Sequence, residues 1–475
     1  MKKLVNGLLF ATLVFLLFLP SHSDGYFRDS NFKATETVTF CLHNLLTYDI
    51  YVEVSEVANG DWQSENRPER LARSYVPGET FYQKMDMNMY RNTHPATFTI
   101  YRWDPTTKSK IEPAIDRWRM DDMNNLRPYH IEDMRSGFQN KIQVITSQFM
   151  GGVHASLVPK NIDLADWMKD MPDDTYISEL TLPATHDSGT FHYSGAPSPW
   201  IVCQHRNFTE TMNWGVRVFD IRLAPYKDDE LTIVHSSYST GLRLAGNFLT
   251  DAKNFLTDHP QETLLVELQR DDGDVNTVKN VLDKILNASP WKEMIFVPTS
   301  TTEFPQLKDV RGKIVLIYDG GIYDNRSKGY WLDYASDVSE QLVSHPNSPN
   351  LKWFVHSNWN ASNYDMKIDH LNDYYRDLAK LNYADRTVMP VSSLNASHDG
   401  VKNPAYFASR LNPWGGGKFG ELEASKRLGI VHTDFYAEPS DIDHMGFYAD
   451  SSGKYNGIGY LLIARNYYQQ KIDPL

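Results

Sequence analysis

Three segments of the sequence carry the side-chain types that acid–base chemistry at a phosphate requires: LPATHDSGT (182–190), GVRVFDIR with TIVH (215–222 and 232–235) and GIVHTDFY (429–436). His186 and His235 can act as general base and general acid, because an imidazole titrates near working pH. A carboxylate beside each ring would orient it, and Asp187 and Asp434 are available for this. Arg222 adds a planar cation that can hold a phosphate through two N–H donors. Together these residue types predict displacement at phosphorus.

The three segments follow short apolar stretches that alternate with amphipathic ones over residues 156–475. This rhythm is typical of a parallel sheet covered by helices. We expect eight strands, at 179–182, 217–222, 231–235, 263–268, 313–318, 352–355, 388–392 and 429–434. That number suits a closed barrel, in which active sites lie at the C-terminal ends of the strands. Because the link 223–230 is too short for a helix, we expect an irregular, distorted TIM-type β/α barrel.

The preceding region, 24–155, has a different pattern. Its segments 38–42, 49–54, 97–101 and 141–145 alternate apolar and polar side chains, as half-buried antiparallel strands do. We therefore expect a small all-β, sandwich-like N-terminal domain. Residues 1–23 have the basic, apolar and small-residue order of a signal peptide, which predicts a secreted, extracellular protein. Sequons that fit a secreted glycoprotein stand at Asn207, Asn287, Asn325, Asn360 and Asn395.

Charge and composition exclude some partners. The net charge of −13 argues against a nucleic-acid partner, because lysine and arginine hold phosphate backbones. Contact with a lipid surface would have to be local and apolar. No apolar stretch after residue 23 approaches the roughly 18 residues that cross a bilayer, so we expect no transmembrane segment. Cys41 and Cys203 could pair in an oxidising compartment, and the oligomeric state stays open.

The strings around His186, Arg222 and His235 resemble the X domain of phosphatidylinositol-specific phospholipase C, in its bacterial-type, single-barrel branch. Supporting stretches lie at 255–263, 311–316 and 404–413, so the resemblance covers about residues 160–440. It implies that His186 takes the proton of the inositol 2-hydroxyl and that His235 protonates the leaving diacylglycerol oxygen, giving an inositol cyclic phosphate. Arg222 would bind the phosphate. The residues themselves leave open whether Asp220 supports Arg222 from behind or takes part in the reaction. Asp434 would partner His186, and Asp187 would partner His235.

The resemblance also bears on metal and substrate. The calcium-using branch carries acidic ligands at the positions of Asp220, Arg222 and Gln269, and a guanidinium there is incompatible with a cation. We therefore expect no metal and no cofactor. Gln269, Arg270 and Asp319 occupy places where bacterial relatives hold the inositol with basic side chains, so the headgroup contacts should differ. The membrane would be touched transiently through a rim, for which Trp200 and Ile201 are candidates.

Two alternatives stay open. The barrel could be a phosphodiesterase for another phospholipid headgroup, an alternative favoured by Gln269 and Asp319. It could also be a non-catalytic module that binds phosphoinositide or glycan headgroups, although binding alone needs neither an acid nor a base. The sequence assigns no partner to His432, which we expect to be structural.

Overall fold

A computed structural model describes residues 35–55, 68–88, 96–120, 128–130, 142–149, 152–227, 229–319, 322, 328–334, 337–346, 348–382, 385–398, 400–436 and 457–474. The expected signal peptide at 1–23 and the sequon at Asn325 lie outside these residues. No helix in the described part of the chain is long and apolar enough to cross a membrane.

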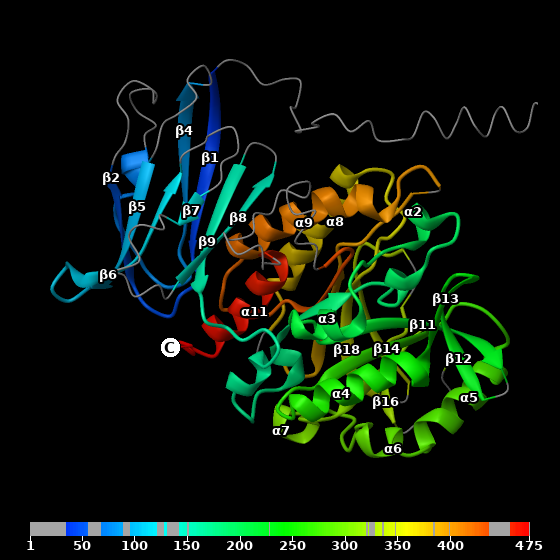
Figure 1. The fold of residues 1–475 in the computed structure, drawn as a ribbon. Helices are drawn as coiled ribbons and strands as arrows, with labels where there is room; N and C mark the ends of the chain where they lie inside the picture. Colours follow the sequence, from blue (N-terminus) through cyan, green and yellow to red (C-terminus); the bar gives the residue numbers. More distant parts are fainter. Residues whose placement is uncertain are drawn as a thin grey trace, which may run out of the picture.

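The N-terminal part consists of two β-sheets (Figure 1). One has the order β4-β1-β9-β8, with bounds Thr80–Asn88, Thr35–Asn44, Gly152–Pro159 and Ile142–Phe149. The other has the order β3-β2-β5-β6-β7, with bounds Ser74–Tyr75, Ile50–Ser55, Ala96–Asp104, Ser109–Met120 and Pro128–His130. Alternation decides which side chains enter the core between them: Ile50 and Val52 are buried, whereas Tyr51 and Glu53 are partly exposed.

The C-terminal part is a nearly closed barrel of parallel strands, preceded by this small all-β domain. Its hydrogen-bonded order is β16, β15, β14, β11, β10, β20, β19 and β18, with bounds Gly329–Trp331, Ile314–Tyr318, Leu264–Arg270, Val218–Lys227, Thr181–Thr185, Gly429–Thr433, Val388–Ser393 and Ser348–His356. Strand β17 (Gln341–His345) adds to β18 in antiparallel orientation. In the described part of the chain β16 and β17 are not paired, and the barrel is irregular there.

One expected barrel strand was wrong. The segment 231–235 lies in β12 (Glu230–His235), which pairs antiparallel with β11 and with β13 (Tyr238–Arg243). Parallel neighbours need a long crossover connection, whereas a tight turn joins only antiparallel strands. β16 takes the remaining place in the parallel set, and β12 carries His235 toward the mouth from outside the ring.

Helices cover the barrel (Figure 1). They are α2 (Ser198–Ile201), α3 (Phe208–Asn213), α4 (Thr250–Asp258), α5 (Val275–Asn287), α6 (Trp291–Met294), α7 (Leu307–Val310), α8 (Tyr364–Leu378), α9 (Pro404–Glu421) and α11 (Gly457–Gln469). Five buried side chains of α5, at the spacing of one helix face, illustrate why: Val278, Val281, Leu282, Ile285 and Leu286.

Helices α9 and α11 lie between the barrel and the N-terminal sheets (Figure 1). Gly417 and Gly420 of α9 permit the approach, since a Cβ at Gly420 would lie 2.7 Å from His43 Cδ2 and one at Gly417 2.9 Å from His154 Cδ2. Cys41 and Cys203 are buried free thiols, so the disulfide that the sequence left open does not form.

Candidate active site

The turn after β10 carries the first histidine. Strand β10 ends at Thr185, and the chain then turns through Asp187 with a positive φ of 44°. Backbone hydrogen bonds fix the turn, because His186 N donates to Thr433 O at 3.2 Å and Asp187 N donates to Asp220 Oδ2 at 3.0 Å. The side chains of the turn are thereby held above the neighbouring strands β11 and β20.

His186 contacts Asp434 on one side and Arg222 on the other. Its Nδ1 lies 2.8 Å from Asp434 Oδ1, and Arg222 Nη2 donates to its Nε2 at 2.9 Å. A donor at Nε2 requires a lone pair there, so the Nδ1 proton faces the carboxylate. Burial lowers the pKa of His186 to about 4 and raises the pKa of Asp434 to about 8. The ring is therefore a neutral imidazole at working pH, as a general base must be.

Arg222 is held by three acidic side chains. Its Nε lies 2.8 Å from Asp187 Oδ1 in an ion pair, and both Nε and Nη2 donate to Asp220 Oδ2 at 3.2 Å. Its Nη1 is 3.7 Å from Asp271 Oδ2. Although burial opposes the charge, these carboxylates raise the pKa of Arg222 still further, so the guanidinium remains a cation. With a side chain 20% exposed, it can still meet a ligand from the mouth.

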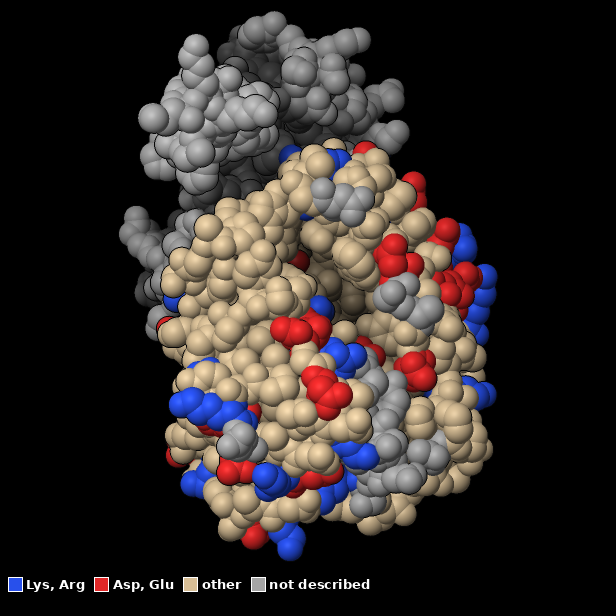
Figure 2. Space-filling view, turned by 90° about the vertical axis from the view of Figure 1, so that its right-hand side faces the viewer, with Lys and Arg blue, Asp and Glu red and all other residues tan. Residues whose placement is uncertain are grey.

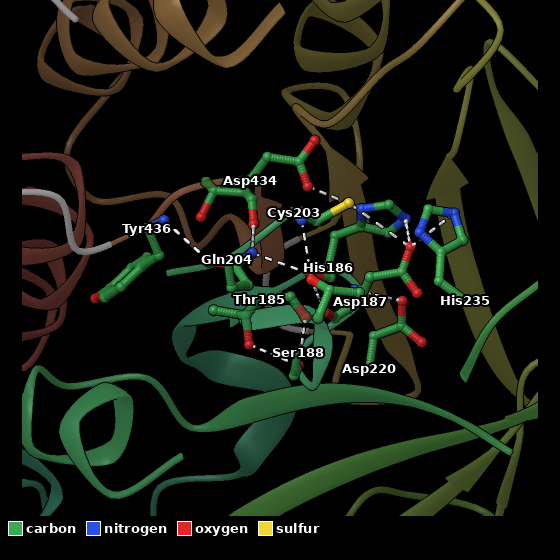
Figure 3. Close-up of polar contacts among 12 residues, drawn as sticks. Thr185, His186, Asp187, Ser188, Cys203, Gln204, Asp220, His235, Asp434 and Tyr436 are labelled. Atoms are coloured by element: carbon green, nitrogen blue, oxygen red, sulfur yellow. Dashed lines mark hydrogen bonds and ion pairs between the residues drawn. The ribbon is translucent and has the colours of Figure 1, made fainter. Parts of the chain in front are cut away.

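The Asp187 carboxylate lies between the two histidine rings (Figure 3). Its Oδ2 is 3.2 Å from His186 Nε2 and 3.5 Å from His235 Nε2, and the ring centroids are 6.5 Å apart. The sequence predicted Asp187 as the partner of His235 alone, but the carboxylate serves both rings. When His186 Nε2 gains a proton, Asp187 can accept a hydrogen bond from it; when Nε2 is unprotonated, Arg222 donates to it.

His235 is oriented by a backbone carbonyl. Its Nδ1 donates to Ile201 O at 2.9 Å, so the free ring nitrogen Nε2 faces Asp187 and the mouth. Ile201 itself is 5% exposed and packs inward, which contradicts its assignment to a membrane rim. Trp200 beside it is only partly exposed. The large apolar side chains exposed on loops at this end are Trp359, after β18, and Val401, after β19.

The mouth is a hollow on the face where the parallel strands end (Figure 2). Side chains in register on β11 and β14 line it in two layers: Asp220 opposite Glu267, and above them Arg222 opposite Gln269. Asp319 follows β15, and its N donates to Leu268 O at 2.9 Å. Arg270 points elsewhere, since its Nη1 donates to Gly273 O at 3.0 Å.

Several residues of the site had no signal in the sequence. Gln204 donates to His186 O at 3.0 Å and to Thr433 O at 2.8 Å, and its Oε1 accepts from Tyr436 N, so it ties the β10 and β20 loops together (Figure 3). Glu267 pairs with His432 at 3.2 Å inside the barrel. These contacts join positions far apart in the chain, and only the closed barrel reveals them.

The donors of His186, Asp187 and Cys203 lie within 4.8 Å of one another, a spacing that can hold a metal ion. They fit a resident cation poorly. Both Asp187 oxygens already contact Arg222 or the imidazoles, and burial raises the pKa of the Cys203 thiol well above its ordinary value, which disfavours the thiolate that metals bind. Metal independence remains a prediction.

The fold and this site define a β/α-barrel protein whose mouth holds two imidazoles around one guanidinium. Residues 186–319 match the family model of the phosphatidylinositol-specific phospholipase C, X domain. This stretch of the chain, from the turn after β10 to the end of β15, is therefore similar to that X domain.

Similar proteins include bacterial enzymes and animal X-domain proteins. The 1-phosphatidylinositol phosphodiesterase of Staphylococcus aureus (strain NCTC 8325 / PS 47) is 27% identical over 291 residues, which cover 58% of this chain and 85% of that protein. The human PI-PLC X domain-containing protein 3 is 28% identical over 145 residues, 24% of this chain and 44% of that protein. Among solved structures, a variant of the S. aureus phosphatidylinositol-specific phospholipase C superposes with a TM-score of 0.54 at 21% identity over 64% of this chain and 98% of that one.

Proposed function

We propose that this chain is a phosphatidylinositol-specific phospholipase C, which cleaves phosphatidylinositol or an inositol-containing lipid anchor by attack of the inositol 2-hydroxyl on the phosphate. The observation that carries the proposal is the shared contact of two imidazoles and one guanidinium with Asp187 at the mouth of the barrel. The names of the bacterial relatives support the same activity.

In the first step His186 Nε2 takes the proton of the 2-hydroxyl as that oxygen bonds to phosphorus. The lowered pKa of His186, to about 4, keeps Nε2 unprotonated, and Nε2 can take the substrate proton once Arg222 Nη2, which donates to it at 2.9 Å, turns to the phosphate. Once protonated, the ring donates from Nε2 to Asp187 Oδ2 at 3.2 Å, while Nδ1–H keeps its hydrogen bond to Asp434 Oδ1. The Asp187 carboxylate therefore stabilises the imidazolium as it forms, and such proton transfer contributes about 10²–10⁴ in rate.

Arg222 would bind the phosphoryl oxygens. Its Nη1 has only a 3.7 Å contact with Asp271, so it is the group of the guanidinium most free to turn to a substrate oxygen. The two contacts with Asp220 hold the guanidinium plane in place meanwhile. Preorganised charge of this kind is usually the largest single contribution to such catalysis.

His235 would complete the reaction. In this step His235 starts with a proton on both ring nitrogens. As the bond from phosphorus to the diacylglycerol oxygen breaks, Nε2 gives its proton to that oxygen, leaving diacylglycerol, an inositol cyclic phosphate and a neutral imidazole. The carbonyl of Ile201 fixes the ring by accepting from Nδ1, so that Nε2 is the nitrogen presented to the leaving group. Reversing these roles would let water open the cyclic product.

We place the lipid contact at Trp359 and Val401, 45% and 73% exposed, instead of at the loop of Trp200. A hydrogen bond from Ser397 N to Trp359 O at 2.8 Å joins the two loops that carry them. With a net charge of −13, the protein would approach a lipid surface through such apolar side chains. Secretion of the protein remains part of this proposal.

The test is a product assay with the purified full chain. Vesicles of phosphatidylinositol, a glycosylated inositol anchor, phosphatidylcholine and phosphatidylethanolamine are incubated separately, and ³¹P NMR follows the products. A cyclic phosphate from an inositol lipid is expected, and His186→Ala and His235→Ala should each lose at least about 10²-fold. The control is His192→Ala, an exposed histidine whose Nδ1 contacts Thr240 O. Cleavage of choline or ethanolamine lipids alone would favour a phosphodiesterase for another phospholipid headgroup. If no lipid were cleaved, the remaining alternative would be a non-catalytic module that binds phosphoinositide or glycan headgroups.

A further inference from the structure

Glu267 and His432 form a buried ion pair below the candidate active site. Glu267 Oε2 lies 3.2 Å from His432 Nε2, and the two residues are 7% and 5% exposed. Glu267 stands in register with Asp220 on the neighbouring strand, so the pair occupies the layer directly beneath Arg222. None of the proposed catalytic steps uses it.

The pair lies beside Asp220, the carboxylate that holds Arg222. Glu267 contacts His432, and Asp220, which faces the same layer, holds Arg222 through two 3.2 Å contacts. Arg222 in turn contacts Asp187 at 2.8 Å. Burial lowers the pKa of His432, but the Glu267 carboxylate outweighs this effect and raises the pKa above its ordinary value, which favours the charged ring.

Asp220 is surrounded by ionisable groups from four strands: Arg222 on its own strand, His186 and Asp187 after β10, Glu267 on β14 and His432 on β20. Tyr334, from the loop after β16, also faces it. Burial raises the pKa of Asp220, but Arg222, His186, the Asp187 N–H and His432 together hold it below its ordinary value. Without the His432 cation, Glu267 would add a second anion to this layer.

We infer that the Glu267–His432 pair is a positioning device, in which His432 neutralises Glu267 beside Asp220 so that Asp220 can aim Arg222 at the phosphate. The inference rests on the proposed function for its effect on catalysis. It differs from a space-filling role, because it requires charge at His432. An uncharged side chain of similar size would fill the barrel but would leave Glu267 and Asp220 as two neighbouring anions.

The test uses His432→Gln, Glu267→Gln and the double variant in the full chain. With His432→Gln we expect kcat/KM for phosphatidylinositol to fall about 10-fold or more, and its acid limb to move to higher pH because Asp220 accepts a proton more easily. The double variant removes both charges, so it should recover part of this loss. His356→Gln is the matched control, since His356 is also fully buried but packs against Tyr374 between β18 and α8.

A second readout separates this inference from the proposed function. Inorganic phosphate binding, followed by calorimetry, should weaken about 10-fold in His432→Gln and recover in part in the double variant. If the wild-type protein cleaved no inositol lipid but His432→Gln still weakened phosphate binding, the proposed function would be refuted and the positioning role would be kept. A folded His432→Gln protein with an unchanged acid limb and unchanged phosphate binding would overturn the positioning role.

Discussion

Replacing Arg222 with lysine tests whether the geometry of the guanidinium matters beyond its charge. Arg222 makes charge-assisted contacts with Asp187 and, through two nitrogens, with Asp220, at 2.8 to 3.2 Å. The ammonium of a lysine can serve one of these carboxylates but not both while it also meets a phosphate. A charge-assisted hydrogen bond contributes about 1.5–3 kcal/mol. Losing one or two of them, with part of the loss recovered by water, gives about 3 kcal/mol, or roughly 10²-fold in rate.

The assay is the initial rate of cyclic phosphate release from phosphatidylinositol, measured as kcat and KM for Arg222→Lys and wild type. Because the clamp acts on charge that develops during the reaction, most of the loss should fall on kcat. Arg243→Lys is the control, an arginine at the end of β13 that contacts Glu230 at 3.8 Å and donates to Thr232 Oγ1 within the hairpin. If Arg222→Lys kept more than about a third of the wild-type rate, stabilisation of the phosphate would not require the planar set of donors on a guanidinium. The role assigned to Arg222 would then be wrong.

Three further predictions concern pH, metal and lipid. The general base must be unprotonated, and burial lowers the pKa of His186 to about 4. The acid limb of the pH profile of kcat/KM should therefore lie near pH 4 to 5, below the range of an ordinary histidine. An acid limb near pH 6.5 would contradict the neutral His186 ring. Activity should persist after dialysis against EDTA, and abolition with recovery on adding calcium would refute metal independence. Trp359→Ala and Val401→Ala should each weaken sedimentation with phosphatidylinositol vesicles about 10-fold, while turnover of a short-chain soluble substrate stays unchanged. The control is Val297→Ala, at the opposite end of the barrel beside the start of β15, which should change neither quantity.

Much of the barrel was readable from the sequence because its strands are short apolar runs separated by helices with one apolar face. The segments 263–268, 313–318 and 388–392 correspond to β14, β15 and β19 within one or two residues. The prediction of a barrel strand at 231–235 was wrong because an apolar run has the same sequence pattern whether the neighbouring strand is parallel or antiparallel. Only the tight turn before it, too short for a crossover, carried the information that it forms a hairpin.

The candidate site was predictable where its residues stand in distinctive strings and unpredictable where contacts depend on closure of the barrel. His186, Arg222, His235 and Asp434 stood out by type and spacing, and the structure brings them to one mouth. The Glu267–His432 pair joins β14 to β20, strands separated by β11 and β10 in the sheet, so its two members approach each other across the barrel interior. The number of residues between Glu267 and His432 in the sequence does not predict the distance between them across the barrel.

Asp187 shows why the site needs both a barrel strand and a hairpin strand. A non-glycine residue at φ 44° carries backbone strain on the order of 1–3 kcal/mol. That conformation turns its carboxylate back over the mouth, where Arg222 takes one oxygen and the two imidazoles share the other. His186 reaches this carboxylate from the end of β10, whereas His235 comes from β12, outside the parallel set. The two rings therefore reach one carboxylate oxygen from two different elements, and this is the juxtaposition that the proposed acid and base at a single phosphate require.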